Sequence, residues 1–266
     1  MKNKCELIVS LTSYPARIDT VHKTIKTLLN QTLKADRVIL WLAEEQFTNR
    51  KLPENLIDLK EKGLTIEWCE DMKSYKKLIP ALKKYPDAII VTADDDAYYK
   101  SNWLEILYRE YINCKDLPVK YIICHRITKF YREDNDWKII AAGKSAYNYA
   151  TYLHKLTGIG GVLYPPKALY YEITNIEKAM KLAPTNDDIW FWFMAILNGT
   201  RIKYVNAGQA EPKNIEGTQK TALWKINDQG EKLFWKAFND LLKEYPVVND
   251  MLLNELNLVT YDERCC

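Results

Sequence analysis

The first half of the chain alternates short apolar runs with segments whose apolar residues recur at helical spacing. Val21, Ile25, Leu28 and Leu29 follow that spacing and predict a helix, which we expect Asp19 to cap. The same criteria predict strands over 6–12, 37–42, 64–68, 88–92 and 120–124, and helices over 53–60, 75–85 and 102–111. Such alternation with short links indicates an α/β fold, a mostly parallel sheet flanked by helices on both faces.

The second half predicts an aromatic helix over 189–197, a polar segment over 206–228 and a further helix within 230–245. An apolar stripe runs along that last helix, formed by Leu233, Phe234, Ala237, Phe238, Leu241 and Leu242. We expect the stripe to pack on the preceding domain, and peripheral docking to a membrane is the alternative. The predicted organisation is one α/β domain over 1–228 with a C-terminal helical extension over 229–266.

Three consecutive carboxylates, Asp94, Asp95 and Asp96, follow the predicted strand over 88–92. Adjacent acidic side chains repel one another unless a cation or water neutralises them, and hard oxygen ligands suit Mg²⁺ or Mn²⁺. A solvated acidic turn is the plain alternative. Ligands bind at the carboxyl ends of strands in open parallel sheets, so we expect this segment to meet the segment 10–17, which follows the first strand.

Composition narrows the function only indirectly. The 266 residues carry a net charge of +3, which is too balanced to indicate a nucleic-acid binder. The six cysteines form neither a paired framework nor a metal-binding spacing, which is typical of a reducing compartment. Because there is no signal-peptide pattern and no apolar run near the ~18 residues of a membrane span, we expect a cytoplasmic protein, with contact at most to the inner face of the cytoplasmic membrane.

Glycine-rich phosphate loops are missing from the sequence, which has no G-x-G-x-x-G and no G-x-x-x-x-G-K-[ST]. An ordered set of other motifs resembles the GT-A (Rossmann-like) glycosyltransferases of bacterial capsule and lipopolysaccharide clusters, near the large family 2 group. The resemblance spans about residues 6–228. Its motifs are Ser10-Leu11-Thr12-Ser13-Tyr14-Pro15-Ala16-Arg17-Ile18 with Gln31-Thr32, Tyr75-Lys76-Lys77-Leu78, Thr92-Ala93-Asp94-Asp95-Asp96 and Asn186-Asp187-Asp188-Ile189-Trp190.

The resemblance implies a site for the nucleotide of a nucleoside diphosphate sugar. In such enzymes the donor nucleotide is held by residues that correspond here to Thr12, Ser13, Tyr14, Arg17, Asp71, Lys77, Asp94 and Asp95. The Asp-x-Asp pair maps onto Asp94 and Asp96, which would bind Mn²⁺ or Mg²⁺. Many relatives add a C-terminal histidine ligand, whereas His22, His125 and His154 all precede the region where it would stand.

The resemblance also implies a catalytic base. Asp187 and Asp188 precede the apolar helix over 189–197, and in inverting relatives the second carboxylate of such a pair takes the acceptor's proton. Helix capping by Asp187, with Asp188 favourably placed on the helix dipole, is the structural alternative. We expect Gly160, Gly161, Trp190 and Trp224 to lie near the donor sugar and the acceptor. Lys220 would add charge at the diphosphate from a mobile loop that Trp224 helps to close. The plain alternatives are a structural turn at the glycines and an ordered surface connection over 206–228.

The resemblance therefore implies a metal-dependent, inverting glycosyltransferase that acts on a saccharide or lipid-linked saccharide of a capsule or lipopolysaccharide. A nucleotidyltransferase acting on sugar phosphates is one alternative, although the segment 10–17 lacks the glycines of its phosphate loop. A catalytically inactive sugar-binding protein of the same fold is another.

Overall fold

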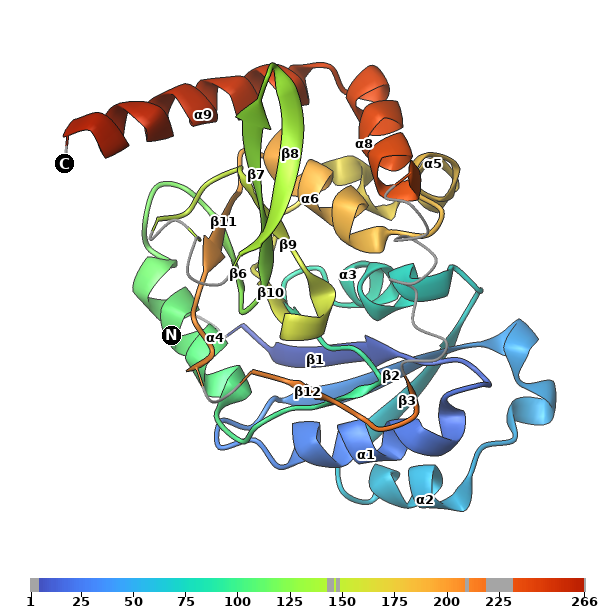
Figure 1. Ribbon diagram of the computed structural model, residues 1–266. Coiled ribbons are helices and arrows are strands. Elements are labelled where there is room, and N and C mark those ends of the chain that lie inside the picture. The colour runs from blue at the N-terminus through green and yellow to red at the C-terminus, as the bar shows by residue number, and fades with distance from the viewer. Residues whose placement is uncertain (1–4, 143–145, 147–148, 209–210, 219–231, 266) are drawn as a thin grey trace.

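A seven-stranded sheet forms the centre of the computed structural model, which describes residues 5–142, 146, 149–208, 211–218 and 232–265 (Figure 1). Its strand order is β11-β6-β10-β4-β1-β2-β3, and β10 alone among these strands runs antiparallel to its neighbours. These strands are β1 (Leu7–Thr12), β2 (Arg37–Ala43), β3 (Leu64–Cys69), β4 (Ile89–Thr92), β6 (Tyr121–Cys124), β10 (Val162–Tyr164) and β11 (Arg201–Tyr204). The predicted mostly parallel α/β sheet is confirmed.

Both faces of the sheet are buried, because successive strand side chains point to opposite sides. Leu7, Val9 and Leu11 of β1 belong to a core shared with α1 (Ile18–Leu29), α2 (Glu54–Ile57) and α4 (Trp103–Cys114). Ile8 and its neighbours on the other face belong to a second core, shared with α3 (Ile79–Lys84), α5 (Ile176–Leu182) and α6 (Asp187–Leu197). The mostly apolar sequences of β1, β2 and β4 match this double burial.

Two local predictions are corrected. Arg17 is the N-cap residue of α1 and makes no side-chain capping bond, whereas Asp19, the predicted cap, lies inside the first turn. A negative charge there still interacts favourably with the helix dipole. The single helix predicted over 75–85 is a 3₁₀ segment, Lys73–Lys77, followed by α3, which begins beside Pro80.

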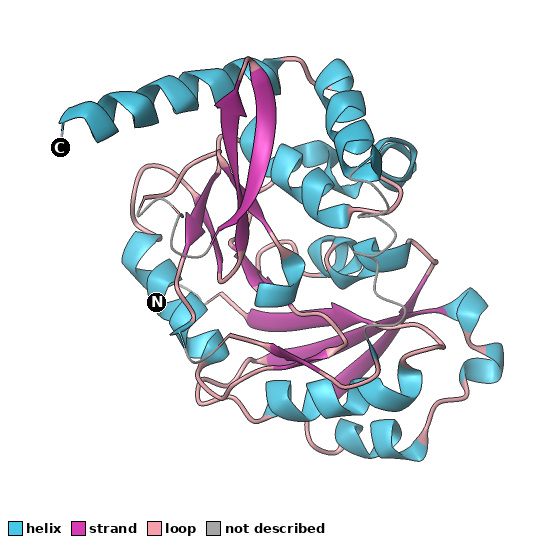
Figure 2. Cartoon of the chain, in the orientation of Figure 1, coloured by secondary structure: helices cyan, strands magenta, loops and turns pink. Residues whose placement is uncertain are grey.

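The region after β6 contains antiparallel strands that the sequence patterns did not predict. β7 (Ile127–Glu133) pairs with β8 (Asp136–Ala142) and with β9 (His154–Leu156), forming the three-stranded sheet visible in Figure 2. Asp134 and Asn135 connect β7 to β8 with φ of 50° and 66°, the left-handed pair that a two-residue hairpin turn requires. A short pair, β5 (Ala97–Tyr98) with β12 (Lys213–Asn214), brings the segment 211–218 against the acidic segment.

The C-terminal region forms α8 (Lys232–Glu244) and α9 (Val247–Cys265). Phe234, Phe238 and Leu241 of α8 are buried, and the Phe238 ring lies 5.3 Å from that of Phe130, centroid to centroid. Leu233, at the edge of the predicted stripe, is 39% exposed. Arg201 of β11 donates to both carboxylate oxygens of Glu255, which ties α9 to the sheet. Within the described residues, no helix combines the length and the apolar character needed to cross a membrane.

Candidate active site

Two chain segments meet where β1 and β4 end. The two strands are parallel neighbours with Ser10 opposite Thr92, so the residues that follow them leave the same edge of the sheet. The predicted convergence of the segment 10–17 with the acidic segment 94–96 is confirmed. Topology alone was sufficient for this prediction, since carboxyl ends of adjacent parallel strands must share an edge.

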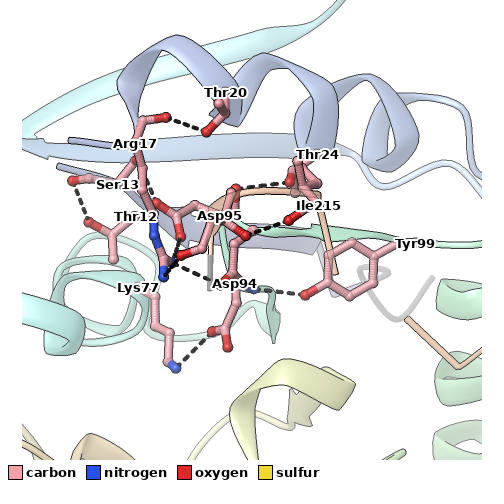
Figure 3. Close-up of polar contacts among 12 residues, drawn as sticks. Thr12, Ser13, Arg17, Thr20, Thr24, Lys77, Asp94, Asp95, Tyr99 and Ile215 are labelled. Atoms are coloured by element: carbon pink, nitrogen blue, oxygen red, sulfur yellow. Dashed lines mark hydrogen bonds and ion pairs between the residues drawn. The ribbon is translucent and has the colours of Figure 1, made fainter. Parts of the chain in front are cut away.

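Arg17, Ser13, Asp95 and Asp96 form one group, here called the Arg17 cluster. Figure 3 labels Arg17, Ser13 and Asp95 of this group. Arg17 Nη1 lies 2.6 Å from Asp95 Oδ1 and 3.1 Å from Asp96 Oδ2. Ser13 Oγ donates to Asp95 Oδ2 at 2.6 Å. The side chains of Arg17, Asp95 and Asp96 are 11%, 7% and 7% exposed, so this is a largely buried group in which one guanidinium serves two carboxylates.

Lys77, Asp94, Asp187 and Asp188 form a second group, here called the Lys77 cluster. Lys77 Nζ lies 3.1 Å from Asp94 Oδ1 and 3.0 Å from Asp187 Oδ2. It also lies 3.8 Å from Asp188 Oδ1. The lysine side chain is 7% exposed, and Figure 3 shows it pointing toward Asp94. One ammonium thus joins the acidic segment after β4 to the acidic pair at the start of α6.

The start of α6 explains how its carboxylates reach the Lys77 cluster. Asn186 is the N-cap, and its side chain accepts a hydrogen bond from the Ile189 N–H at 3.1 Å. The alternative role of Asp187 as the cap is therefore wrong, because Asn186 already fills it. Asp188 Oδ2 instead accepts from the Gly158 N–H at 2.9 Å, which fixes that carboxylate at the glycine segment before β10.

Gly158 leaves room for the close approach of these charged groups. A Cβ at that position would stand 2.6 Å from Lys77 Nζ and 3.0 Å from Asp188 Oδ1. A side chain at residue 158 would therefore displace the Lys77 ammonium and crowd the Asp188 carboxylate, and glycine lets both charged groups lie against the backbone. Sequence analysis singled out the neighbouring glycines, since nothing in the spacing distinguishes Gly158 from Gly160 and Gly161.

Together, burial and neighbouring charges raise the pKa values of Asp188, Asp94 and Lys77 in the Lys77 cluster. Burial raises the pKa of Asp188, and the neighbouring Asp187 adds to the rise while Lys77 opposes it. Burial likewise raises the pKa of Asp94 against the effect of Lys77. For Lys77 burial works against the charged form, but Asp187, Asp94 and Asp188 together hold its pKa well above the usual range. Perturbed carboxylates around a fixed ammonium are typical of functional sites.

The arrangement of Asp94 and Asp96 bears directly on the predicted metal site. The two carboxylates contact different basic side chains, Lys77 and Arg17 respectively. In the part of the chain that the structure describes, no three His, Cys, Asp or Glu side chains form a group that could hold a metal ion. Binding of Mn²⁺ or Mg²⁺ by Asp94 and Asp96 stays a prediction, and it requires ligands beyond these side chains.

The remaining nucleotide-site candidates are spread along the same edge of the sheet. Thr12 Oγ1 donates to the Trp41 carbonyl at 2.9 Å, and the Tyr14 ring lies under the Arg17 guanidinium at 5.7 Å. Asp71 accepts from Gln46 and from Lys76, the neighbour of Lys77. Asp71 therefore lies at the end of β3, with its own basic partner, and does not share the ammonium of Lys77.

The four residues predicted near the donor sugar and acceptor have mixed outcomes. A Cβ on Gly160 would meet Arg126, and one on Gly161, whose φ is +94°, would meet the Trp103 ring at 2.3 Å. Packing thus explains both glycines. Trp190 is fully buried and donates its Nε1–H to the Ile173 carbonyl at 3.2 Å, so its predicted contact with substrate is corrected to a role in the core. Trp224, like Lys220, lies outside the described residues.

Two residues near the site carry no sequence signal. Tyr99 is buried, and its hydroxyl accepts from the Asp94 N–H at 2.8 Å, which fixes the backbone of the acidic segment. Lys155 of β9 is buried, and its Nζ donates to the Leu156 carbonyl at 3.2 Å. Burial lowers the pKa of Lys155, and Asp188 is the foremost of the charges that oppose this shift. Lys155 could not be placed from sequence, because β9 has only three residues and was not predicted.

No family model matches this sequence, and no curated protein matches it in sequence. Solved structures are similar in fold. S. aureus TarS 1–349 in complex with UDP aligns with a TM-score of 0.55 at 14% identity, over 95% of this chain and 71% of that one. The same protein in complex with UDP-GlcNAc aligns with a TM-score of 0.52 at 14% identity, over 82% of this chain and 61% of that one. The longer S. aureus TarS gives 0.51 at 13% identity, over 79% of this chain and 36% of that chain, so this chain spans about a third of it.

TarS is a GT-A-type glycosyltransferase, and the likeness shows that this chain has a GT-A-like fold. The fold implied by the sequence resemblance is therefore confirmed. At 12–14% identity the likeness establishes the fold alone.

Proposed function

We propose that this protein is a glycosyltransferase that takes a sugar from a nucleoside diphosphate sugar and transfers it to a hydroxyl of a saccharide or lipid-linked saccharide. One observation carries the proposal: acidic segments far apart in sequence, 94–96 and 187–188, meet at Lys77 beyond the carboxyl ends of parallel strands. Ligands of open α/β sheets bind at that edge. Structures of this fold in complex with UDP and UDP-GlcNAc support the choice of donor class.

A divalent cation is part of the proposal. Asp94 and Asp96 would hold Mn²⁺ or Mg²⁺ together with diphosphate oxygens of the donor, because such ions use one or two carboxylates plus substrate phosphates. The side chains of Asp94 and Asp96 suit such an ion, because both offer carboxylate oxygens. The Asp94 side chain, 28% exposed, is also the most accessible of the Lys77 cluster. When bound, the cation would supply a Lewis acid that stabilises negative charge on the leaving diphosphate.

Asp188 is the proposed base. The Gly158 N–H occupies Oδ2, whereas Oδ1 is buried and accepts no hydrogen bond. An acceptor hydroxyl that reaches Oδ1 would therefore find a positioned carboxylate oxygen ready to take its proton. A single displacement with this base on the face opposite the leaving group inverts the anomeric carbon, so the proposal includes an inverting reaction.

The acceptor in this proposal is a saccharide of a bacterial capsule or lipopolysaccharide, and the support is the sequence resemblance. A cytoplasmic location, with lipid-linked acceptor presented at the inner membrane face, belongs to the same proposal. Most of the α8 stripe is buried in the core, so any contact with a membrane would have to use another surface of the protein.

A thermal-shift screen tests the donor class. Nucleoside diphosphates and their sugars, each with Mn²⁺, are added to the protein, and a ligand at 100 times its Kd should stabilise the fold by about 2.7 kcal/mol. We expect the nucleoside diphosphate of one particular base to raise Tm, and the nucleoside diphosphate sugars of that base to raise it further. Unchanged Tm with every nucleotide would contradict the proposal. Release of the nucleoside diphosphate from the conjugate that binds then separates an enzyme from an inactive sugar-binding protein.

A further inference from the structure

Lys77 is anchored at the end of the central strands through its backbone. Ser10 Oγ donates to the Lys77 carbonyl at 2.6 Å, and Trp41 Nε1 donates to the same Ser10 Oγ at 3.0 Å. Both hydrogen bonds are buried. Lys77 is therefore fixed to β1 and β2 at its backbone, which limits how far its side chain can move from the acidic cluster.

The ammonium group of Lys77 occupies the position of a cation within a set of carboxylates. Oxygens of Asp94, Asp187 and Asp188 surround Nζ at 3.1, 3.0 and 3.8 Å. Gly158 also lies beside the ammonium, since a Cβ on this residue would stand 2.6 Å from Nζ. To bind the donor nucleotide, the role that the resemblance implied, the Lys77 ammonium would have to share or leave these carboxylates.

We propose that Lys77 is an internal cation that competes with the divalent metal for Asp94, so that metal loading transfers this carboxylate from the lysine to the metal. The inference rests on the proposed function only in placing Asp94 among the metal ligands. Three carboxylates and one ammonium give the Lys77 cluster a formal charge of minus two, which attracts a divalent ion. The ammonium, however, already occupies the position between the three carboxylates. Divalent ions then bind weakly until donor phosphates supply further ligands.

The competition links donor loading to the base. Asp94 is shared between the metal and Lys77, whereas Asp187 and Asp188 contact Lys77 from the other segment. With Asp94 bound to a metal, the ammonium would keep Asp187 and Asp188 as its partners and would hold this pair in place. Lys77 is in this account a positioning residue, which acts on the metal and on the base through their carboxylates.

The test measures Mn²⁺ alone, without nucleotide, by the electron paramagnetic resonance signal of the free ion. Lys77→Met removes the ammonium and keeps most of the apolar stem, and we expect Mn²⁺ affinity to rise ~10-fold or more, since the nearest positive charge is lost. Lys76→Met is the matched control, because Lys76 is also buried but pairs with Asp71. It should bind Mn²⁺ as the wild type does. Equal affinities for all three proteins, or the same rise in both variants, would overturn the proposal.

A charge-matched variant covers the case in which Lys77→Met fails to fold, which circular dichroism reports. Lys77→Met combined with Asp187→Asn restores the formal charge of minus two but leaves no ammonium among the carboxylates. Tighter Mn²⁺ binding than in the wild type supports competition, whereas wild-type affinity shows that net charge alone decides and refutes it. Because no nucleotide is present, either result leaves the thermal-shift test of the donor class independent.

Discussion

Replacing Arg17 with methionine should destabilise the protein strongly at neutral pH and much less in mild acid. The substitution keeps an apolar stem but leaves Asp95 and Asp96 buried without the guanidinium that lies 2.6 and 3.1 Å from their oxygens. Removing one partner of a buried ion pair costs roughly 3–5 kcal/mol, because the other charge remains desolvated. The Ser13 hydroxyl is then the partner left to Asp95 from the Arg17 cluster.

Protonation sets a limit on that cost and gives it a pH dependence. Burial already raises the pKa of Asp95 in spite of Arg17, and losing the arginine raises it further. A carboxylate that is neutral in the folded variant must gain a proton on folding, which costs about 1.36 kcal/mol for each pH unit above its unfolded pKa of about 3.9. The loss of unfolding free energy that one such carboxylate can cause is therefore at most about 4 kcal/mol at pH 7 and about 1.5 kcal/mol at pH 5.

Urea denaturation at the two pH values measures the effect. Arg37→Met is the control, since Arg37 pairs with Glu6 where the side chains are 46% and 34% exposed, and such pairs contribute about 1 kcal/mol or less. We expect Arg17→Met to lose several times more free energy of unfolding than Arg37→Met at pH 7, with most of the difference gone at pH 5. Equal losses in the two variants, or a loss at pH 5 as large as at pH 7, would refute the reasoning.

Three further predictions concern the reaction. Asp96→Ala should remove most metal-dependent nucleotide binding, and unchanged calorimetric affinity for a nucleoside diphosphate with Mn²⁺ would refute its assignment as a ligand. Burial raises the pKa of Asp188, and a base must be ionised to accept a proton. As the pH is lowered, kcat/KM should therefore start to fall at a pH above ~4, the pKa of a free aspartate. A fall centred at pH ~4 would argue against Asp188 as the base. Product from an inverting reaction has the anomeric configuration opposite to the donor's, which proton NMR coupling constants report, and a retained configuration would exclude single displacement.

The parallel part of the fold could be predicted because its signal is local. Apolar runs match β1 to β4 and β6, and helical spacing matches α1 and α4. β10 could not be predicted, since it has only three residues and its place between β4 and β6 depends on pairing with distant strands. The β7–β8 hairpin did carry a signal, because Asp134-Asn135 is a pair of residues that tolerates positive φ.

In the candidate site too, some features could be predicted from the sequence and others could not. Topology predicted that the segments 10–17 and 94–96 converge, because strand ends must meet at one edge. It could not predict that Asp94 faces Lys77 while Asp96 faces Arg17, since adjacent side chains diverge by rotamer and packing. The approach of Asp188 to Gly158 joins residues thirty apart in sequence, so only the folded chain reveals which glycine matters.

The central claim is that the acidic groups around Lys77 transfer a sugar from a nucleoside diphosphate, with Asp188 as the base. Release of nucleoside diphosphate from the nucleotide sugar that binds tightest, with Mn²⁺ and a saccharide acceptor, tests it most directly in the wild type and in Asp188→Asn. The account predicts release by the wild type, a ~10²-fold or greater loss of turnover in Asp188→Asn with donor affinity unchanged, and a smaller loss in Asp187→Asn. No release by the wild type, or normal turnover in Asp188→Asn, would contradict it.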